Sequence, residues 1–389
     1  MLPILVIGAG PVGLSLALAL ARRGVRVEVF EALPELSDEA RASTFHPPTL
    51  EMFAEWEVID AVLAQGHTVR SLEYWERATR EHVARFDYAL IANDTPYPFR
   101  LQLPQSRATR ILLPHIQQRP YARVHFNHRL MGITQTADGV TAEFETPTGP
   151  LTVEGTYIIG ADGSRSTVRK LLNLSFEGLT YPDRFLLVPC DVDLQPIFPG
   201  LGPVNYIFDP EEWIIILHLP EVVRVVFQIK PAEDEAEILR PDAVHARLRR
   251  LAGAQPFTIK GTSIYSVHQR VAETFRVGRV LLAGDAAHIN NPAGGMGMNS
   301  GIHDAHKLAQ ALIEVLNGGA DSALDDYARV RRAWAVERVQ HHTHETYSAM
   351  VVKDEARRLA RNARFRALAA DPRAAREYLL QASMLDERI

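Results

Sequence analysis

The stretch Pro3-Ile-Leu-Val-Ile-Gly8-Ala-Gly10-Pro-Val-Gly13 decides the fold of this 389-residue chain. Its apolar start, residues 3–7, is typical of a short buried strand, and its glycines have the G-x-G-x-x-G spacing of a turn that leads into a helix. A helix over 14–23 that ends at Gly24 and a second strand over 25–31 are expected next. This order predicts a βαβ unit that opens a doubly wound α/β domain.

The glycine turn has the residues that a dinucleotide phosphate requires. Gly8 permits the tight turn, Gly10 lets the backbone approach a pyrophosphate, and Gly13 lets the helix pack closely on the strand. The N-terminus of that helix then faces the anion. Glu31 ends the second strand, where a carboxylate accepts hydrogen bonds from ribose hydroxyls, which disfavours NADP at this site.

Two later motifs extend this pattern. Asp162-Gly163 follows an expected buried strand at 157–160, although the motif alone is equally typical of a simple helix cap at Ser164 or Ser166. Gly284-Asp285 follows another strand, at 279–283, and can hold the hydroxyls of a ribityl chain. The glycine-rich loop 292–299 then opens a helix near Gly297, whose N-terminus can stabilise negative charge on the pyrimidine edge of a reduced flavin. This third element favours FAD over NAD.

Through these three ordered motifs the chain resembles the FAD-dependent aromatic hydroxylases, the single-component flavoprotein monooxygenases that include para-hydroxybenzoate hydroxylase and phenol hydroxylase. The resemblance covers residues 1 to about 340. It places Arg41, Gln105 and Arg107 at the FAD, with a surface guanidinium as the alternative for the two arginines. It also implies FAD contacts at Gly8, Gly10, Gly13, Glu31, Asp162, Asp285, Pro292, Gly297, Met298 and Asn299, with Pro292 beside the flavin ring and the last three beside its pyrimidine edge.

The resemblance also implies the activity. NADPH or NADH reduces the flavin, O2 adds to it, and the resulting flavin hydroperoxide hydroxylates a small aromatic substrate, phenolic or heteroaromatic. The cofactor carries this chemistry, so neither a side-chain nucleophile nor a metal is required. The sequence agrees, because it has no G-x-S-x-G or H-E-x-x-H motif, and His303 with His306 lacks a third metal ligand.

The expected architecture is a Rossmann-like FAD-binding domain that is assembled from separated segments. It comprises residues 1–179 and 268–324, interrupted by a β-rich substrate domain at 180–267 and followed by C-terminal helices at 325–389. Ligand sites favour domain interfaces, so the substrate is expected between the β-rich insertion and the glycine-rich loop 292–299, which is called the flavin loop below. The candidates to position or deprotonate it are Tyr206, His218, Tyr265 and His268, with Pro292 from the loop.

Composition narrows the class further. A net charge of −5 disfavours nucleic acid as a partner, and no apolar run reaches the length of a membrane span. The single cysteine, Cys190, lies in an apolar run and fits a buried thiol in a reducing, cytoplasmic compartment. The arginine-rich C-terminal helices are expected to be solvated, and a monomer and a homodimer both remain open.

Two rival functions remain. The first is another flavin oxidoreductase, such as a reductase, a halogenase, or an oxygenase of polyketides or quinone precursors. The segment Glu212-Trp213-Ile214-Ile215 does not match the Trp-x-Trp-x-Ile-Pro stretch that a halogenase would carry. The second is a non-catalytic FAD-binding redox sensor, which the glycine loop at 292–299 disfavours.

Overall fold

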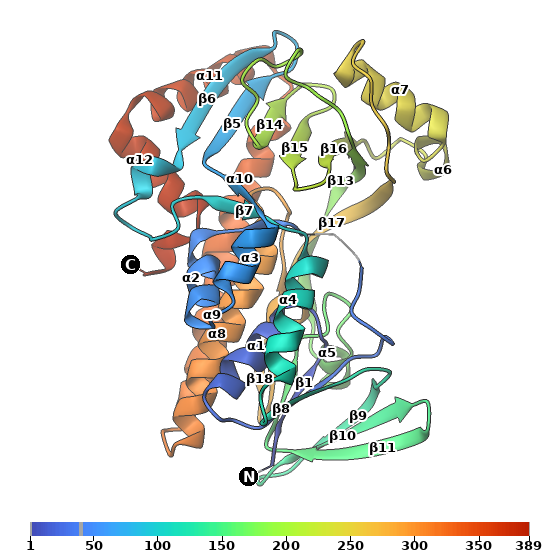
Figure 1. Cartoon of the computed structure of the whole chain (residues 1–389), viewed down its shortest axis with the longest axis vertical. Coiled ribbons are helices and arrows are strands. Elements are labelled where there is room, and N and C mark those ends of the chain that lie inside the picture. The colour runs from blue at the N-terminus through green and yellow to red at the C-terminus, as the bar shows by residue number, and fades with distance from the viewer. Residues whose placement is uncertain (1, 39–41, 389) are drawn as a thin grey trace.

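The computed structural model describes residues 2–38 and 42–388, with side chains to Asp386. The lower part of the molecule in Figure 1 is built on a six-stranded sheet. Its order is β18 (Arg276–Val277), β19 (Val280–Leu282), β12 (Tyr157–Gly160), β1 (Ile4–Ile7), β2 (Val27–Phe30), β8 (Ala122–His125). All neighbours are parallel except the β18–β19 pair. Since these strands come from three separated parts of the chain, the predicted assembly and its opening βαβ unit are confirmed.

Helices cover the six-stranded sheet and bury its apolar residues. Every residue of β1 is buried, and α1 (Pro11–Arg22) buries nine of its residues. It packs against α8 (Gly297–Leu316) and α4 (Gln105–Gln117). The remaining elements of this part are α2 (Pro47–Glu55), α3 (Ile59–Gln65), α5 (Thr167–Leu171), α9 (Ser322–Trp334), and a small sheet of β3 (Thr44–Phe45), β7 (Arg100–Gln102) and β4 (His67–Val69).

A sequence pattern in this part is only half matched by the structure. Apolar and polar residues alternate over 124–144, and this pattern predicts antiparallel hairpin strands around the turn residues Asp138-Gly139. The hairpin forms between β9 (Arg129–Gln135) and β10 (Val140–Thr146), and β11 (Gly149–Gly155) extends it. Residues 122–125, however, form β8, which pairs in parallel with β2, because half-buried strands of either kind alternate in the same way.

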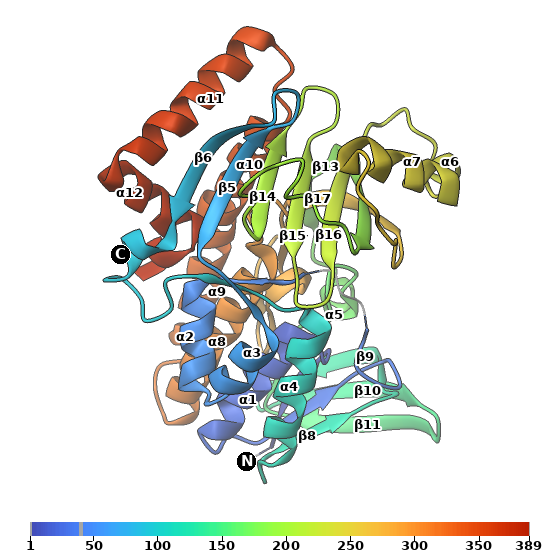
Figure 2. The ribbon, with the colours of Figure 1, turned by 45° about the horizontal axis from the view of Figure 1, so that its top comes forward.

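A second, eight-stranded sheet forms the upper part of the molecule. Its order is β20 (His288–Ile289), β17 (Ser263–Ala272), β13 (Phe176–Cys190), β16 (Val223–Ile229), β15 (Ile214–His218), β14 (Val204–Phe208), β5 (Ser71–Glu76), β6 (Glu81–Asp87). The helices α6 (Glu235–Ile238) and α7 (Pro241–Ala252) lie on the side opposite the C-terminal helices (Figure 2). Those helices are α10 (His341–Met350), α11 (Glu355–Ala370) and α12 (Pro372–Ala382). The short turns η1 (Tyr88–Ile91), η2 (Gly284–Ala286) and η4 (Leu385–Arg388) and the π-helical segment η3 (Ala335–Gln340) complete the fold.

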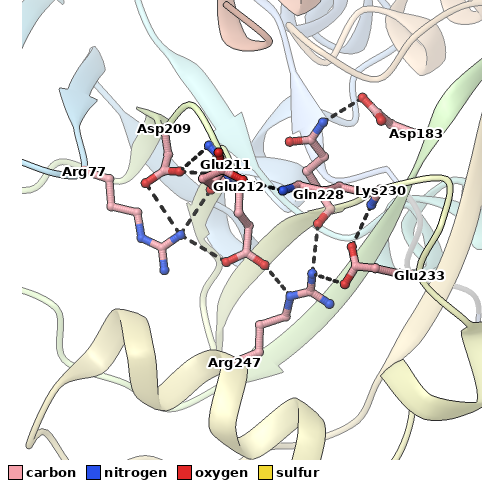
Figure 3. A network of polar contacts seen from close by, with 9 residues as sticks. All are labelled: Arg77, Asp183, Asp209, Glu211, Glu212, Gln228, Lys230, Glu233 and Arg247. Carbon is pink, nitrogen blue, oxygen red and sulfur yellow. Dashed lines mark hydrogen bonds and ion pairs between the residues drawn. The ribbon is translucent and has the colours of Figure 1, made fainter. Parts of the chain in front are cut away.

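An ion-pair network fixes α7 to the turns at the ends of inner strands of this sheet (Figure 3). Arg247 of α7 is bound to Glu212 and, at 2.8 Å, to Glu233, while Arg77 reaches Glu212 at 3.0 Å. Asp209 lies 3.9 Å from the same arginine. Each guanidinium in this network has a carboxylate partner, so the network is self-sufficient and structural.

Two general features of the described chain bear on function. No described helix has the length and apolar character that crossing a membrane requires. Cys190 is buried, and burial raises the pKa of its thiol to about 12, so it stays protonated at neutral pH.

Candidate active site

The glycine turn after β1 leaves open space at one position only. A Cβ on Gly8 would lie 2.5 Å from the carbonyl oxygen of Ala161, and one on Gly13 would lie 2.0 Å from the oxygen of Gly8. A Cβ on Gly10, by contrast, would meet no atom within 4 Å. The first turn of α1 also has no acidic residue and no side-chain cap. An uncapped helix N-terminus beside open space fits a pyrophosphate.

Glu31 lies beside this turn. Its Oε2 accepts a hydrogen bond from the amide of Ala9 at 2.8 Å, and its Oε1 accepts one from the amide of Leu33 at 3.0 Å. The carboxylate is therefore fixed in orientation at the rim of the glycine turn. Its remaining lone pairs fit the ribose hydroxyls of an adenosine.

The Gly284-Asp285 motif packs against Val12, which lies within the glycine motif 8–13 in the first turn of α1. A Cβ on Gly284 or on Gly301 would lie 2.7 Å from Cγ2 of Val12, so η2, α1 and α8 meet at this side chain. Asp285 is exposed in η2. The helix α8 begins at Gly297, as predicted, and has neither an acidic residue in its first turn nor a side-chain cap. Two uncapped helix N-termini thus lie near one exposed acid, which fits the pyrophosphate of FAD at α1 and the pyrimidine edge of its flavin at α8.

A buried triad that the sequence analysis missed holds this arrangement. Asp304 of α8 accepts hydrogen bonds from the amide of Gly284 at 2.9 Å, from His288 at 2.9 Å and from Arg331 at 2.6 Å. Burial alone would raise the pKa of Asp304, but the charge of Arg331 and the hydrogen bonds from Arg331 and His288 outweigh it and lower that pKa. Its position within α8 carries no motif signal, so only the packing reveals it.

Asp162 acts as a helix cap in the structure. It accepts hydrogen bonds from Ser166 and from the amide of Thr167, both at 2.6 Å, while Ser166 caps α5. Burial raises its pKa. Arg169 of α5 then donates to the carbonyl oxygen of Ala286 at 2.7 Å, which joins the Asp-Gly motif to the Gly-Asp motif. The capping alternative weighed for this motif is therefore seen, and Arg169 is a link that sequence reasoning did not anticipate.

Asn299 locks the flavin loop from inside. Its Nδ2 donates to the carbonyl oxygens of Thr44 and Gly295, both at 2.8 Å, and its Oδ1 accepts from the amide of His46 at 2.9 Å and from Thr49. The side chain is fully buried and satisfied, so what it offers a flavin is the backbone of the first helical turn. Met298 and Gly297 are half-buried in that turn, and Pro292 is exposed.

The three remaining residues that the resemblance places at the FAD are Gln105, Arg107 and Arg41. Gln105 begins α4 and its Oε1 accepts from the amide of Ala42 at 3.4 Å. Arg107 forms an exposed ion pair with Glu221 of the upper sheet region, which matches the surface alternative. Arg41 lies outside the described residues.

Tyr206 connects the upper sheet to the flavin loop. Its hydroxyl accepts a hydrogen bond from the amide of Gly294 at 3.0 Å. Strand register places Tyr206 in one row across the sheet with Tyr74, Ile215, Val226 and Leu187. This face packs on Ala293 of the loop, and Tyr265 lies on it too, with its ring centroid 5.3 Å from that of Phe185. Burial raises the pKa of Tyr265 beyond its usual range, so it is neutral.

The two histidine candidates are not brought to this face. His218 alternates with Leu217 and shares the opposite side of β15 with Ile214 and Ile216, which belong to another core cluster. Its Nε2 is buried without a described partner, and burial lowers its pKa. His268 forms an exposed hydrogen bond with Thr180 at 2.9 Å. Side chains along a strand point alternately to the two faces of the sheet, so both histidines lie on the face opposite to Tyr206 and Tyr265.

A dinucleotide turn, an exposed acid after a strand and a glycine loop below the upper sheet together form a site that fits FAD. Residues 1–342 match a family described as "FAD binding domain". The chain belongs to this family of FAD-dependent aromatic hydroxylases. It is an FAD-dependent aromatic monooxygenase, and FAD is its cofactor.

Individual relatives agree with the family. The chain is 32% identical to a para-nitrophenol 4-monooxygenase of Pseudomonas sp. (strain WBC-3), over 99% of this chain and 96% of the relative. It is 32% identical to a 6-hydroxy-3-succinoylpyridine 3-monooxygenase of Pseudomonas putida, covering 86% of each. The crystal structure of a p-nitrophenol 4-monooxygenase from Pseudomonas putida superposes with a TM-score of 0.93 at 33% identity, covering 99% and 98% of the two chains.

Proposed function

We propose that the chain hydroxylates a single-ring phenol with NADH or NADPH as reductant and O2 as oxidant. The observation that carries this proposal is the hydrogen bond between Tyr206 and Gly294, which seats the tyrosine-rich sheet face on the flavin loop. A relative that matches nearly end to end acts on para-nitrophenol by name, which supports a substrate of that size. FAD, when bound, supplies reduction by the nicotinamide and the transfer of one oxygen atom from O2.

The cofactor-holding residues follow from the site. Gly8, Gly10 and Gly13 shape the turn for the pyrophosphate, and Glu31 takes the ribose of the adenosine. The other proposed contacts are Arg41, Gln105, Asp162, Asp285, Pro292, Gly297, Met298 and Asn299, while the ion pair of Arg107 with Glu221 favours the surface alternative for that residue. Asp162 and Asn299 act by holding the turn and the loop in place, since their side-chain atoms are already hydrogen-bonded.

The sheet face orients the substrate and excludes water. Ile215, Val226 and Leu187 offer an apolar surface to one side of a ring, with Tyr265 beside them. Tyr206 accepts from Gly294, so its own O–H hydrogen remains available to donate to a substrate oxygen. Among the candidates, Tyr206 and Tyr265 are therefore proposed to contact the substrate.

The domain division stays a proposal. We assign 1–179 and 268–324 to the FAD-binding domain, 180–267 to the substrate domain and 325–389 to the C-terminal helices. Strands β5 and β6, at 71–87, complete the substrate sheet from within the first segment. A monomer or a homodimer is compatible with this arrangement.

The test is to follow NADH and NADPH oxidation in air by the FAD-loaded protein across a panel of phenols, hydroxybenzoates and hydroxypyridines. We expect a single-ring phenol to stimulate oxidation and to return as a product one oxygen atom heavier. Oxidation that no aromatic compound stimulates would contradict the proposal and favour another flavin chemistry.

A further inference from the structure

A cavity of about 180 Å³ lies between the flavin loop and the C-terminal helices. Its walls come from Met296 of that loop, from the π-helical segment η3, from α10 and from the residues at the end of α12. None of the described residues that line it belongs to the upper sheet, so it is distinct from the proposed substrate face of that sheet. The proposed function therefore gives this cavity no role.

The floor of the cavity is apolar and adaptable. Met296, Val339 and Met384 form a small buried cluster, each at most 2% exposed, and Trp334 packs against it. Methionine side chains adjust to the shape of a ligand and make favourable contacts with aromatic rings. An apolar cavity of about 150 Å³ can hold a benzene ring. At about 180 Å³, this cavity has room for one ring with a small substituent.

Trp334 offers a hydrogen-bond donor at this cavity. Its indole Nε1 is buried and has no hydrogen-bond partner among the described residues, whereas Trp75 donates its Nε1 to Asn205 at 3.2 Å. A buried donor without a partner is costly, and an indole N–H can only donate. Trp334 also directly precedes η3, and π-helical segments are frequent at functional sites. A ligand that completes this site therefore carries an acceptor, such as a carbonyl oxygen.

The charges around the cavity favour an uncharged ligand. Three carboxylates line it and disfavour an anion, against a single arginine, and these residues are Glu337, Glu345, Asp386 and Arg338. A cation cannot accept the hydrogen bond that the indole N–H of Trp334 offers. The acceptor must therefore belong to a neutral molecule.

His342 joins the cavity to the flavin loop. Burial and then the charge of Arg100 lower its pKa to about 4, so its imidazole is neutral at physiological pH. A Cβ on Gly294 of the loop would lie 4.0 Å from its Cδ2. On the C-terminal side, Arg100 fixes the wall by donating to the carbonyl oxygen of Ala382 at 2.8 Å. Met296 directly precedes α8, so an occupant of the cavity would touch the residue that leads into the first turn of this helix.

We propose that this cavity is a second, regulatory binding site for an uncharged single-ring aromatic molecule with a hydrogen-bond acceptor. The ring packs against the thioethers of Met296 and Met384, and the acceptor receives the N–H of Trp334. An occupant restrains Met296 and thereby the flavin loop. The proposal goes beyond the proposed function, because it does not depend on which compound the active site hydroxylates.

The experiment follows the indole N–H signals of the four tryptophans by NMR, in the FAD-loaded full chain labelled with 15N at tryptophan. The probes are acetophenone, benzoate and benzylammonium, which share one ring and differ in charge. Trp334→Phe identifies the signal of Trp334, and the other three signals are internal controls. Trp213 is the closest match, because its Nε1 is also buried without a described partner but does not line the cavity.

A pair of matched variants tests the cavity itself. Val339→Phe fills it from η3, whereas Val330→Phe makes the same change on α9, where the side chain is exposed and outside the cavity. The visible absorption of FAD is recorded on every sample, because it reports whether an occupant of the cavity affects the flavin loop.

We expect acetophenone to shift the Trp334 signal in a saturable way and to leave the Trp213 signal in place. The FAD absorption should change with the same saturation curve. Val339→Phe should weaken this binding by at least about tenfold, and Val330→Phe should leave it unchanged. Benzoate and benzylammonium should bind at least about tenfold more weakly than acetophenone.

A Trp334 signal that acetophenone does not shift would overturn the site, as would equal binding by Val339→Phe and Val330→Phe. If Val339→Phe does not fold, the wild-type signals of Trp334 and Trp213 decide alone. An equal response to either charged probe would overturn the ligand class, and a shift without any change in FAD absorption would overturn the regulation. Failure of the proposed function looks different, because it appears in the mass of the product and not in these signals.

Discussion

The hydroxyl of Tyr206 and the backbone amide of Gly294 share a hydrogen bond of 3.0 Å. The tyrosine belongs to the upper sheet and the glycine to the loop that opens α8, so this contact fixes the height of the sheet above the flavin loop.

Removing that hydroxyl tests the relationship. Tyr206→Phe keeps the ring and its stacking on Tyr74 but leaves the amide of Gly294 without its acceptor. We expect FAD to remain bound and kcat/KM for the preferred phenol to fall by about tenfold, since a hydrogen bond to a neutral group is worth about 1 kcal/mol and substrate alignment is lost with it. Tyr157→Phe, at the start of β12 in the lower sheet, removes a hydroxyl bound to Asp321 and should leave kcat/KM unchanged.

In the glycine turn, we expect an alanine substitution to be tolerated by the fold at Gly10 but not at Gly13. Gly10→Ala adds a methyl group to open space, so the protein should fold with unchanged stability but lose at least about tenfold in FAD affinity, measured by fluorescence titration of the FAD-free protein. Gly13→Ala should fail to fold, because its methyl group would overlap the oxygen of Gly8. Equal FAD affinity of Gly10→Ala and wild type would show that the pyrophosphate lies elsewhere.

The Asp304 triad predicts a stability effect. Asp304→Asn would leave Arg331 as an uncompensated buried charge, so the free energy of unfolding in urea should fall by about 3–5 kcal/mol. Asp326→Asn removes an exposed carboxylate paired with Arg329 and should cost less than about 1 kcal/mol. A similar small loss in both variants would mean that the triad does not stabilise the fold.

His342 predicts how stability depends on pH. Its pKa is lowered from 6.5 to about 4 by burial and then by Arg100, so below pH 6.5 the unfolded chain binds a proton that the folded chain does not. Stability is complete above pH 6.5 and falls by at most about 3 kcal/mol as the pH drops to 4. His46, also lowered by burial, acts in the same direction. The free energy of unfolding is measured in urea at several pH values from about 7.5 to 4.5. It should fall less steeply with decreasing pH in His342→Gln than in wild type. An equal pH dependence in the two proteins would refute the assignment.

Local patterns account for what the sequence predicted well. The glycine turn, Glu31 and the start of α8 at Gly297 were predicted because each depends on the backbone of a few adjacent residues. The β-rich character of 180–267 was predicted in the same way, because its β-branched runs are bounded by turn residues.

Contacts between distant segments account for what was missed. Arg100 lies in an ordinary apolar stretch, and its partner Ala382 is 282 residues away. The side of the sheet that His218 faces depends on strand register, which an apolar run such as 214–217 does not specify because both of its faces are buried. Asn299 carries the family pattern, yet whether its amide turns inward is decided by Thr44 and Thr49, far away in the chain.

One measurement tests the central claim most directly. The FAD-loaded protein is incubated with NADH or NADPH, a phenol that stimulates oxidation, and O2 labelled with a heavy isotope, and the product mass is recorded. We predict one labelled oxygen atom on the aromatic ring of each product molecule. An unlabelled hydroxyl group, or a phenol recovered unchanged while the nicotinamide is consumed, would contradict the assignment as an aromatic monooxygenase.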